Sequence, residues 1–200
     1  MSSVVSRRGG VVQDPPFVRW LLNDRRAAWL WLLPRLWLGW QWIDASRHKI
    51  ADPAWVRTGD ALKGFWLAAV KIPETGRPPI AFDWYREFLQ MLLSAHVYTW
   101  FAKLVAFGEL LIGVALIAGA FTGIAALLGG FMNWNFMMAG SASVNPVFFA
   151  ISVGLILAWK VSGYVGADYI LLPWLGTPWG RSRCGPLEAR APSPGHASGD

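Results

Sequence analysis

Two charged residues stand alone in long apolar stretches of the sequence, and they are its first candidates for chemistry. Arg35 is the only charged residue at positions 27–43, and Glu109 is the only one at positions 104–159. A charged side chain in such a stretch usually has a partner, because exposing the charge to hydrocarbon is costly. Counted along two antiparallel helices, the two residues lie at similar depth. The sequence therefore predicts a buried Arg35–Glu109 ion pair.

Two further residues, Asn133 and Trp42, are expected near the Arg35–Glu109 pair. Asn133 falls on a face of small residues and reaches the layer of Glu109, and Trp42 shares a helix side with Arg35. Two interpretations stay open. The pair fixes the register of the helices, or it is the catalytic centre of a quinone site, a small-anion site or a proton path. In a quinone site, Glu109 exchanges a proton while Arg35 holds it charged. Asn133 and Trp42 then contact the quinone.

His48 and His96 form a second constellation, at the outer ends of the first two predicted spans. Two histidines on neighbouring helices can hold a haem iron or a transition metal. The alternative is that both are interfacial residues. Because no third ligand accompanies them, the sequence predicts no metal site, and quinone is the only cofactor expected, as an electron acceptor.

The composition places these candidates in a membrane protein. Of the 200 residues, 54% are hydrophobic and only 15% are charged, against roughly 25% charged residues in an average soluble domain. Soluble enzymes and disordered chains are excluded. The net charge of +6 comes from basic residues that flank apolar segments, where they face lipid headgroups rather than nucleic acid. The single cysteine, Cys184, excludes oxidoreductases that work through a cysteine pair.

Four segments are long and apolar enough to be interpreted as membrane-spanning helices. They cover about residues 28–46, 99–118, 122–139 and 146–162. The predicted fold is an all-α, integral membrane four-helix bundle within residues 28–176.

Four crossings place both ends of the chain on one side, and basic residues near both ends favour the cytoplasm. Residues 1–27 are then a cytoplasmic segment, and residues 177–200 are a disordered cytoplasmic tail. The loop at residues 47–98 lies outside the membrane. Within it, residues 53–70 and 83–95 are predicted helices, which form a cap over the outer end of the bundle.

The order of three motifs resembles the DoxX family of membrane proteins. Residues 35–49 (RLWLGWQWIDASRHK) carry an Arg, a Gly four residues later and a Lys at the outer end. Residues 107–130 (FGELLIGVALIAGAFTGIAALLGG) carry a Glu, a Gly four residues later and a glycine turn, and residues 162–173 (SGYVGADYILLP) carry a Gly and then an Asp. The long loop with Pro53 and Trp55 makes the chain most similar to the DoxD branch. The residues that match by position are Arg35, Gly39, Lys49, Glu109, Gly113 and Asp168.

The resemblance implies a four-helix protein of the prokaryotic cytoplasmic membrane. In the DoxD branch it implies a subunit of a thiosulfate:quinone oxidoreductase, which acts together with a small DoxA subunit. We then expect Lys49, Arg47 and Arg57 to draw thiosulfate to the cap, and quinone to enter from the lipid between the helices.

Two other classes of protein stay open. One is a non-catalytic membrane scaffold or accessory protein of a redox or detoxification complex, in which the Arg–Glu pair is architectural. The other is a transporter, in which copies of the chain dimerise around a path. Co-purifying partners without turnover indicate a scaffold, whereas bound quinone indicates an oxidoreductase.

Overall fold

The computed structural model describes residues 4–5, 11–12 and 14–176, and nearly all of them are helical. The predicted tail at residues 177–200, with Cys184, lies outside the described residues. Two short strands, β1 (Val4–Val5) and β2 (Val11–Val12), pair in antiparallel orientation. The helices are α1 (Pro16–Asn23), η1 (Arg25–Ala27), α2 (Ala28–Ala51), α3 (Pro53–Val56), α4 (Asp60–Val70), α5 (Asp83–Ser94), α6 (Tyr98–Ala118), α7 (Thr122–Met138), α8 (Asn145–Leu157), α9 (Trp159–Ser162) and α10 (Asp168–Trp174). The predicted all-α fold is confirmed.

The helix boundaries follow from the local sequence. The predicted helix at residues 53–70 is split into α3 and α4 at Gly59, whose φ of 79° suits a residue without a Cβ. Asp52 caps α3 by accepting a hydrogen bond at 2.9 Å from the backbone N–H two residues later, as N-cap carboxylates do. Gly119 ends α6 in the left-handed conformation, at the predicted break. Pro146 lies in the first turn of α8, where proline is tolerated.

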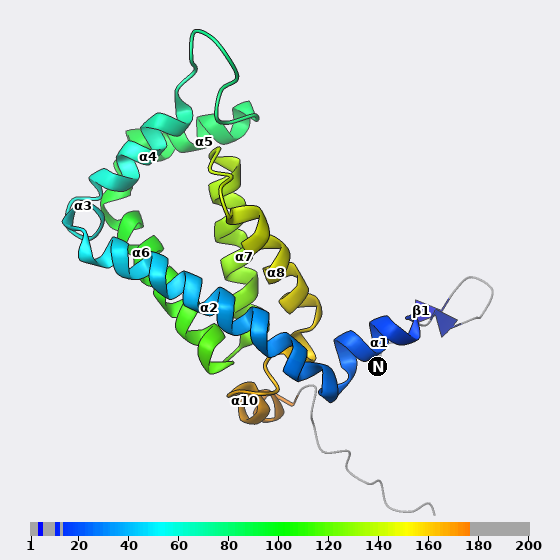
Figure 1. The fold of residues 1–200 in the computed structure, drawn as a ribbon. Coiled ribbons are helices and arrows are strands. Elements are labelled where there is room, and N and C mark those ends of the chain that lie inside the picture. Colours follow the sequence, from blue (N-terminus) through cyan, green and yellow to red (C-terminus); the bar gives the residue numbers. More distant parts are fainter. Residues whose placement is uncertain (1–3, 6–10, 13, 177–200) are drawn as a thin grey trace, which may run out of the picture.

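Two helix pairs and a cap make up the described fold (Figure 1). α2 lies along α6, and α7 lies along α8. The two pairs meet near the turn between α6 and α7 and diverge from there, and α4 and α5 bridge the ends that are furthest apart (Figure 1). We call α3, α4 and α5 the cap, and we call the opposite end, with the α6–α7 turn and α10, the turn end. The segment between α2 and α6 therefore contains helices, as the sequence predicts for residues 53–70 and 83–95.

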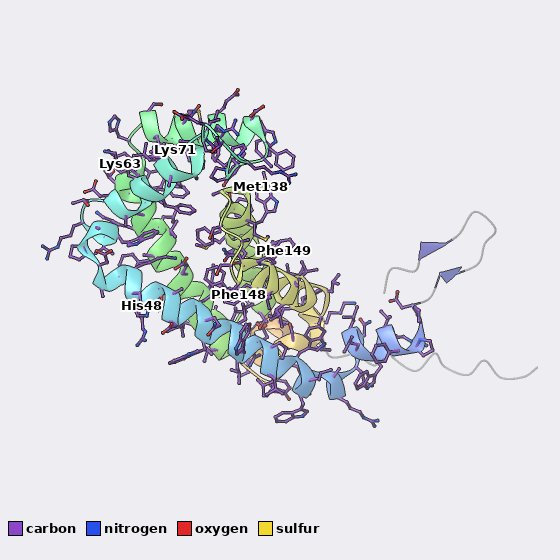
Figure 2. The ribbon with its side chains drawn as sticks, turned by 45° about the horizontal axis from the view of Figure 1, so that its top comes forward. His48, Lys63, Lys71, Met138, Phe148 and Phe149 are labelled. Carbon is purple, nitrogen blue, oxygen red and sulfur yellow. The ribbon has the colours of Figure 1, made fainter. Side chains whose placement is uncertain are left out.

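Two apolar cores hold these parts together. The cap core joins α4 and α5 to the adjacent ends of α6 and α7, with Leu62 2% exposed at its centre. The bundle core lies among α2, α6, α7 and α8, and Leu116 is fully buried in it. From α8, the Phe148 ring (Figure 2) reaches this core and lies 6.3 Å from the ring of Trp42. Each buried side chain of this size stabilises the fold by roughly 1.5–3 kcal/mol.

Among the described residues, one helix is long and apolar enough to cross a membrane. This helix is α6, with 21 residues, whereas α8 is apolar but has only 13. Helices occur at all four predicted spans, but α7 has 17 residues, short of the roughly 20 that a span needs. One side of α6 is exposed. Its residues Leu104, Phe107, Leu111 and Val114 are between 49% and 69% exposed.

α2 and α6 approach closely at two glycines. A Cβ on Gly113 would lie 2.8 Å from the carbonyl oxygen of Gly39 and 2.9 Å from the backbone nitrogen of Ile43. Backbone atoms cannot move aside as a flexible side chain does, so glycine is required here. Small residues at such a contact let two helix backbones pack tightly.

We predict that Gly113→Ala lowers the melting temperature, because the added methyl group forces α2 and α6 apart at a cost of about 1–3 kcal/mol. Thermal unfolding followed by circular dichroism measures the change. Gly108→Ala on the same helix is the matched control, since a Cβ there would meet no heavy atom within 4 Å. Alanine at that position stabilises the helix by up to about 1 kcal/mol. Equal melting temperatures for the two variants would contradict the close contact.

Candidate functional site

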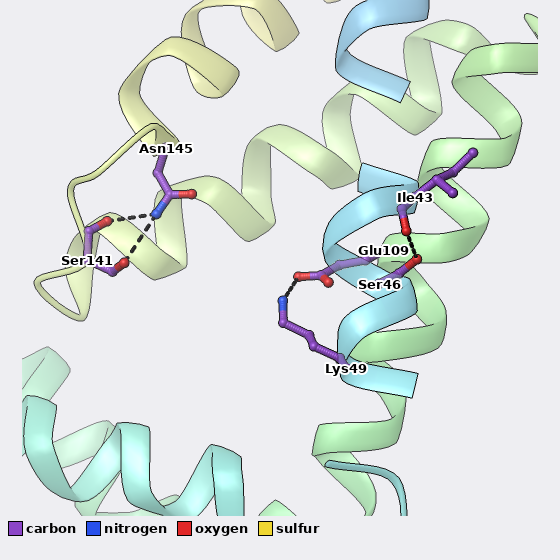
Figure 3. A network of polar contacts seen from close by, with 6 residues as sticks. All are labelled: Ile43, Ser46, Lys49, Glu109, Ser141 and Asn145. Carbon is purple, nitrogen blue, oxygen red and sulfur yellow. Dashed lines mark hydrogen bonds and ion pairs between the residues drawn. The ribbon is translucent and has the colours of Figure 1, made fainter. Parts of the chain in front are cut away.

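Glu109 is paired with Lys49. Nζ of Lys49, near the end of α2, donates a hydrogen bond to Oε1 of Glu109 in the middle of α6 (Figure 3). The side chain of Glu109 is 1% exposed and that of Lys49 is 21% exposed, so protein encloses the pair almost completely. A buried carboxylate depends on such a partner, because an isolated charge in the interior is strongly unfavourable.

Arg35 does not reach Glu109, so the predicted Arg35–Glu109 pair is wrong. The guanidinium group of Arg35 lies against Gly119 at the turn end. Gly119 follows Glu109 by ten residues, which is roughly 15 Å along the helix axis. The sequence-based estimate that Arg35 and Glu109 lie at similar depth is wrong for two reasons. The start of α2 extends well beyond the level at which α6 ends, and α2 continues one turn past its predicted end. That added turn brings Lys49 beside Glu109.

Arg35 instead belongs to a cluster at the turn end, which we call the turn cluster, together with Asp168. Arg35 donates hydrogen bonds to the carbonyl oxygens of Ser162 at 3.0 Å and Val165 at 2.8 Å. The carboxylate of Asp168 accepts two backbone N–H groups at the start of α7, at 2.6 and 2.9 Å. A carboxylate is favourable at a helix N-terminus. These contacts hold α2, α7 and α10 together, and the catalytic role expected of Arg35 beside Glu109 loses its geometric basis.

Asn133 lies level with Glu109, as the sequence predicts. A Cβ on Gly129 of α7 would lie 3.1 Å from Nε1 of Trp42 and 3.3 Å from Cγ2 of Ile112 on α6. These three residues are therefore at one level of the bundle. Asn133 is one turn closer to the cap than Gly129, and Glu109 is one turn closer to the cap than Ile112. The two polar side chains therefore share the next level, one turn from Trp42.

We call Lys49, Glu109 and Asn133 the polar layer. Nζ of Lys49 lies 5.3 Å from the ring centroid of Phe136 on α7 and 5.1 Å from that of Trp55 in the cap. An ammonium group over an aromatic ring is stabilised by the charge distribution of the ring. Lys49 thus links α2, α6, α7 and the cap, between the two apolar cores.

Several buried polar atoms at this depth have no hydrogen-bond partner among the described residues. They are both amide atoms of Asn133, Oε2 of Glu109 and Nε1 of Trp42, and Oγ of Ser152 on α8 is in the same state. A buried polar group without a partner costs about 1–3 kcal/mol. Such atoms mark a place where water or the polar part of a ligand can bind.

An apolar groove runs between α6 and α7 beside the polar layer. Its volume is about 910 Å³, within the roughly 300–1,000 Å³ of small-molecule sites. Cap residues line one end of it, and Leu111 and Phe131 on its walls are well exposed. Gly108, Met132 and Phe136 also line the groove. Because they neighbour the polar layer along α6 and α7, they form the wall between that layer and the groove.

Tyr85 of α5 is a groove residue that the sequence analysis does not predict. Its buried hydroxyl donates to the backbone oxygen and Oδ1 of Asn135 on α7, at 3.1 and 3.2 Å. Burial raises the pKa of the Tyr85 phenol to about 12, so it stays a donor at neutral pH. The sequence gives only a weak indication of this role, since a tyrosine in an amphipathic helix is common. The hydrogen-bond partner of Tyr85 is supplied only when the cap docks on α7.

Arg47 and Arg57, which are expected to bind an anion together with Lys49, lie on the surface. Nε of Arg47 is 2.8 Å from Oδ1 of Asp44, in an exposed pair. Arg57 is exposed on the cap. Because Arg47 and Lys49 are two residues apart on a helix, they point to different sides of it. Lys49 is therefore not part of a shared anion site with Arg47.

His48 and His96 each make contacts within their own segment. Nε2 of His48 lies 3.8 Å from Oδ2 of Asp44, and the ring points away from the bundle (Figure 2). Nδ1 of His96 is 2.8 Å from the backbone oxygen of Ser94. Both rings are exposed, which favours the interfacial interpretation over haem ligation. Within residues 14–176 and the two strands, no group of three or more His, Cys, Asp or Glu residues could hold a metal ion.

The fold and the site define a helical protein of two helix pairs, with an enclosed ion pair beside an apolar groove. Comparison of the chain with known protein families, curated proteins and solved structures finds no match. The resemblance to the DoxX family therefore stays a prediction.

We predict that Lys49→Met lowers the free energy of unfolding by about 3–5 kcal/mol, because it leaves Glu109 buried without a partner. Adding Glu109→Gln should restore much of the loss, since an amide needs no counter-charge. Denaturant unfolding of the purified protein measures both. Arg47→Met is the matched control. It breaks only the exposed pair with Asp44 and should cost less than about 1 kcal/mol.

A double-mutant cycle separates the observed pair from the pair that the sequence predicts. Lys49→Met and Glu109→Gln should be strongly coupled. Arg35→Met and Glu109→Gln should be additive within about 0.5 kcal/mol, because the two sites are far apart. Strong coupling of Arg35 to Glu109 would overturn the assignment.

Proposed function

We propose that the protein is an integral membrane protein whose groove binds a quinone taken from the bilayer, and that it is the membrane subunit of a redox complex. In this proposal α2, α6, α7 and the α8–α9 segment cross the membrane, and the cap lies on its outer surface. Exposed apolar side chains on all four support immersion, since large apolar patches mark contact with membrane or partners. Leu33, Leu111, Leu127 and Leu157, one on each helix, are between 56% and 70% exposed.

The distribution of charge supports a cytoplasmic location for the turn end and for both termini. Arg19 lies on α1, and Arg25 and Arg26 lie in η1, directly before α2. Lys160 donates a hydrogen bond to Asn23 at 2.9 Å, which keeps α1 beside α9. Basic residues concentrate at the cytoplasmic ends of membrane helices. The prokaryotic cytoplasmic membrane is implied by the DoxX resemblance.

The groove is the observation that carries the proposal. Its lining extends along α6 from Phe101 to Ala118, roughly 26 Å, which suits a long isoprenoid chain. Its walls carry side chains that face the apolar exterior, so a lipid-soluble molecule can enter sideways between α6 and α7. The polar layer, with hydrogen-bonding groups that have no partner in the part of the chain that the structure describes, lies behind one wall.

The electron donor follows from the resemblance to the DoxD branch. The protein would oxidise thiosulfate in a complex with a partner that docks on the cap. This partner would be a small DoxA-like subunit or another redox protein. The exposed side chains of Arg47 and Arg57 support long-range attraction of an anion to this surface. They do not form an enclosed anion site.

The six residues that match the DoxX family by position lie in three groups along α2. This grouping supports the resemblance. The groups are Lys49 with Glu109, Gly39 with Gly113, and Arg35 with Asp168 in the turn cluster. Motif residues that are far apart in the sequence thus lie close together in the structure.

A non-catalytic membrane accessory protein is the second candidate. The turn cluster favours it, because Arg35 and Asp168 use their hydrogen bonds to hold helix ends together. In that case the groove holds lipid, and the protein shows no turnover of its own.

We predict that Gly108→Leu lowers the quinone that co-purifies with the protein several-fold, because leucine fills the groove. A Cβ at this position meets no heavy atom within 4 Å, so the side chain enters open space. Organic extraction followed by mass spectrometry quantifies the bound quinone. Gly64→Leu on α4 is the matched control. Its Cβ also meets nothing within 4 Å, and Gly64 does not line the groove.

With a DoxA-like partner present, the wild type and Gly64→Leu should reduce a quinone analogue in a thiosulfate-dependent reaction, and Gly108→Leu should not. Wild-type protein that carries no quinone and shows no turnover would contradict the proposal and favour the accessory protein.

A further inference from the structure

We propose that the polar layer is a second compartment of the site, which binds the carbonyl oxygen on the head of the molecule whose chain lies in the groove. The aromatic ring of Phe136 is the partition between the two compartments. The inference rests on the proposed function for the identity of that molecule as a quinone. The chemistry that the layer recognises is an uncharged carbonyl next to an apolar chain, and a lipid ester offers the same group.

The polar layer holds hydrogen-bond donors that lack an acceptor. Asn133 is fully buried, and its Nδ2 has no partner among the described residues; Nε1 of Trp42, one turn away, is in the same state. Lys49 donates to Glu109, and an ammonium group carries three donors. A carbonyl oxygen has two lone pairs, so it can accept from Asn133 and Lys49 together.

The charge of the layer favours a neutral guest. Glu109 and Lys49 form an ion pair, so the two full charges offset each other. An anion would be repelled by the Glu109 carboxylate, and a cation would be repelled by Lys49. A polar but uncharged group avoids both repulsions and satisfies the amide of Asn133.

Phe136 lies between the two compartments. Its side chain lines the groove, and its ring centroid is 5.3 Å from Nζ of Lys49. Met132, one turn earlier on α7, also lines the groove, whereas the adjacent Asn133 is fully buried at the level of Glu109. A change of the Phe136 rotamer, which is a local motion, opens the wall and lets a carbonyl replace the ring beside Lys49.

The test compares two compounds that carry the same decyl chain, a decyl-benzoquinone and decylbenzene. Each displaces an environment-sensitive alkyl dye from the groove of the detergent-solubilised full chain, and half-displacement gives the ratio of their affinities. The wild type should bind the quinone at least tenfold more tightly than decylbenzene.

Asn133→Leu should reduce this ratio five- to tenfold and leave decylbenzene binding unchanged. Its melting temperature should not fall, because Asn133 loses no hydrogen bond within the described chain. Phe136→Ala should raise the ratio, because the partition is removed. Gln90→Leu, which removes an exposed amide on α5, is the matched control and should keep the wild-type ratio.

The outcomes separate this inference from the proposed function. An unchanged ratio in Asn133→Leu overturns the carbonyl site, while quinone binding by the groove persists. Displacement by neither compound overturns the groove itself. Micelles of an ester-linked phospholipid and of its ether-linked analogue form a third arm. If only the ester lipid competes and the quinone does not, the carbonyl site is supported with a lipid as its ligand, and the quinone function fails.

Discussion

An enclosed carboxylate sets the geometry of this protein. Glu109 is buried in the middle of α6, and a carboxylate there needs a cation at hydrogen-bond distance. Lys49 supplies it only if the last turns of α2 lie beside the middle of α6. This condition fixes the register of the two helices. It places Gly39 against Gly113 and carries Arg35 past Glu109 to the turn end.

The groove follows from the way α6 and α7 use their small-residue faces. α6 places Gly113 against Gly39 of α2, and α7 places Gly130 against Ser152 of α8. These two faces are therefore not free to pack against each other. The helix pairs are tied together at the turn end by Asp168 and at the cap by the Tyr85 hydroxyl and the cap core. Between the two ties, the facing sides of α6 and α7 line the apolar groove.

The positions of the helices and the outward faces could be predicted from the sequence, because the spacing of small and apolar residues decides which side of a helix is buried. Leu104 and Leu111 lie on an outward face of α6, and Asn133 is level with Glu109. The partner of Glu109 could not be predicted, since it depends on a sliding of α2 along α6 by a few turns. Arg35 binds loop carbonyl groups, which no sequence pattern marks. The groove depends on the angle between two helices, which periodicity does not encode.

The two charged clusters differ in how far the described chain satisfies their hydrogen bonds. In the turn cluster, both carboxylate oxygens of Asp168 and both terminal nitrogens of Arg35 have partners within the chain, and Nε of Arg35 has none among the described residues. In the polar layer, neither amide atom of Asn133 has a partner among the described residues, and Oε2 of Glu109 has none either. Each such atom costs about 1–3 kcal/mol as long as it has no partner. A guest that supplies an acceptor removes this cost, whereas an apolar analogue leaves it in place, and sites with unpaired polar groups discriminate strongly on that basis. In the proposed site, the selectivity of the layer is therefore set by the hydrogen bonds that the described residues do not supply.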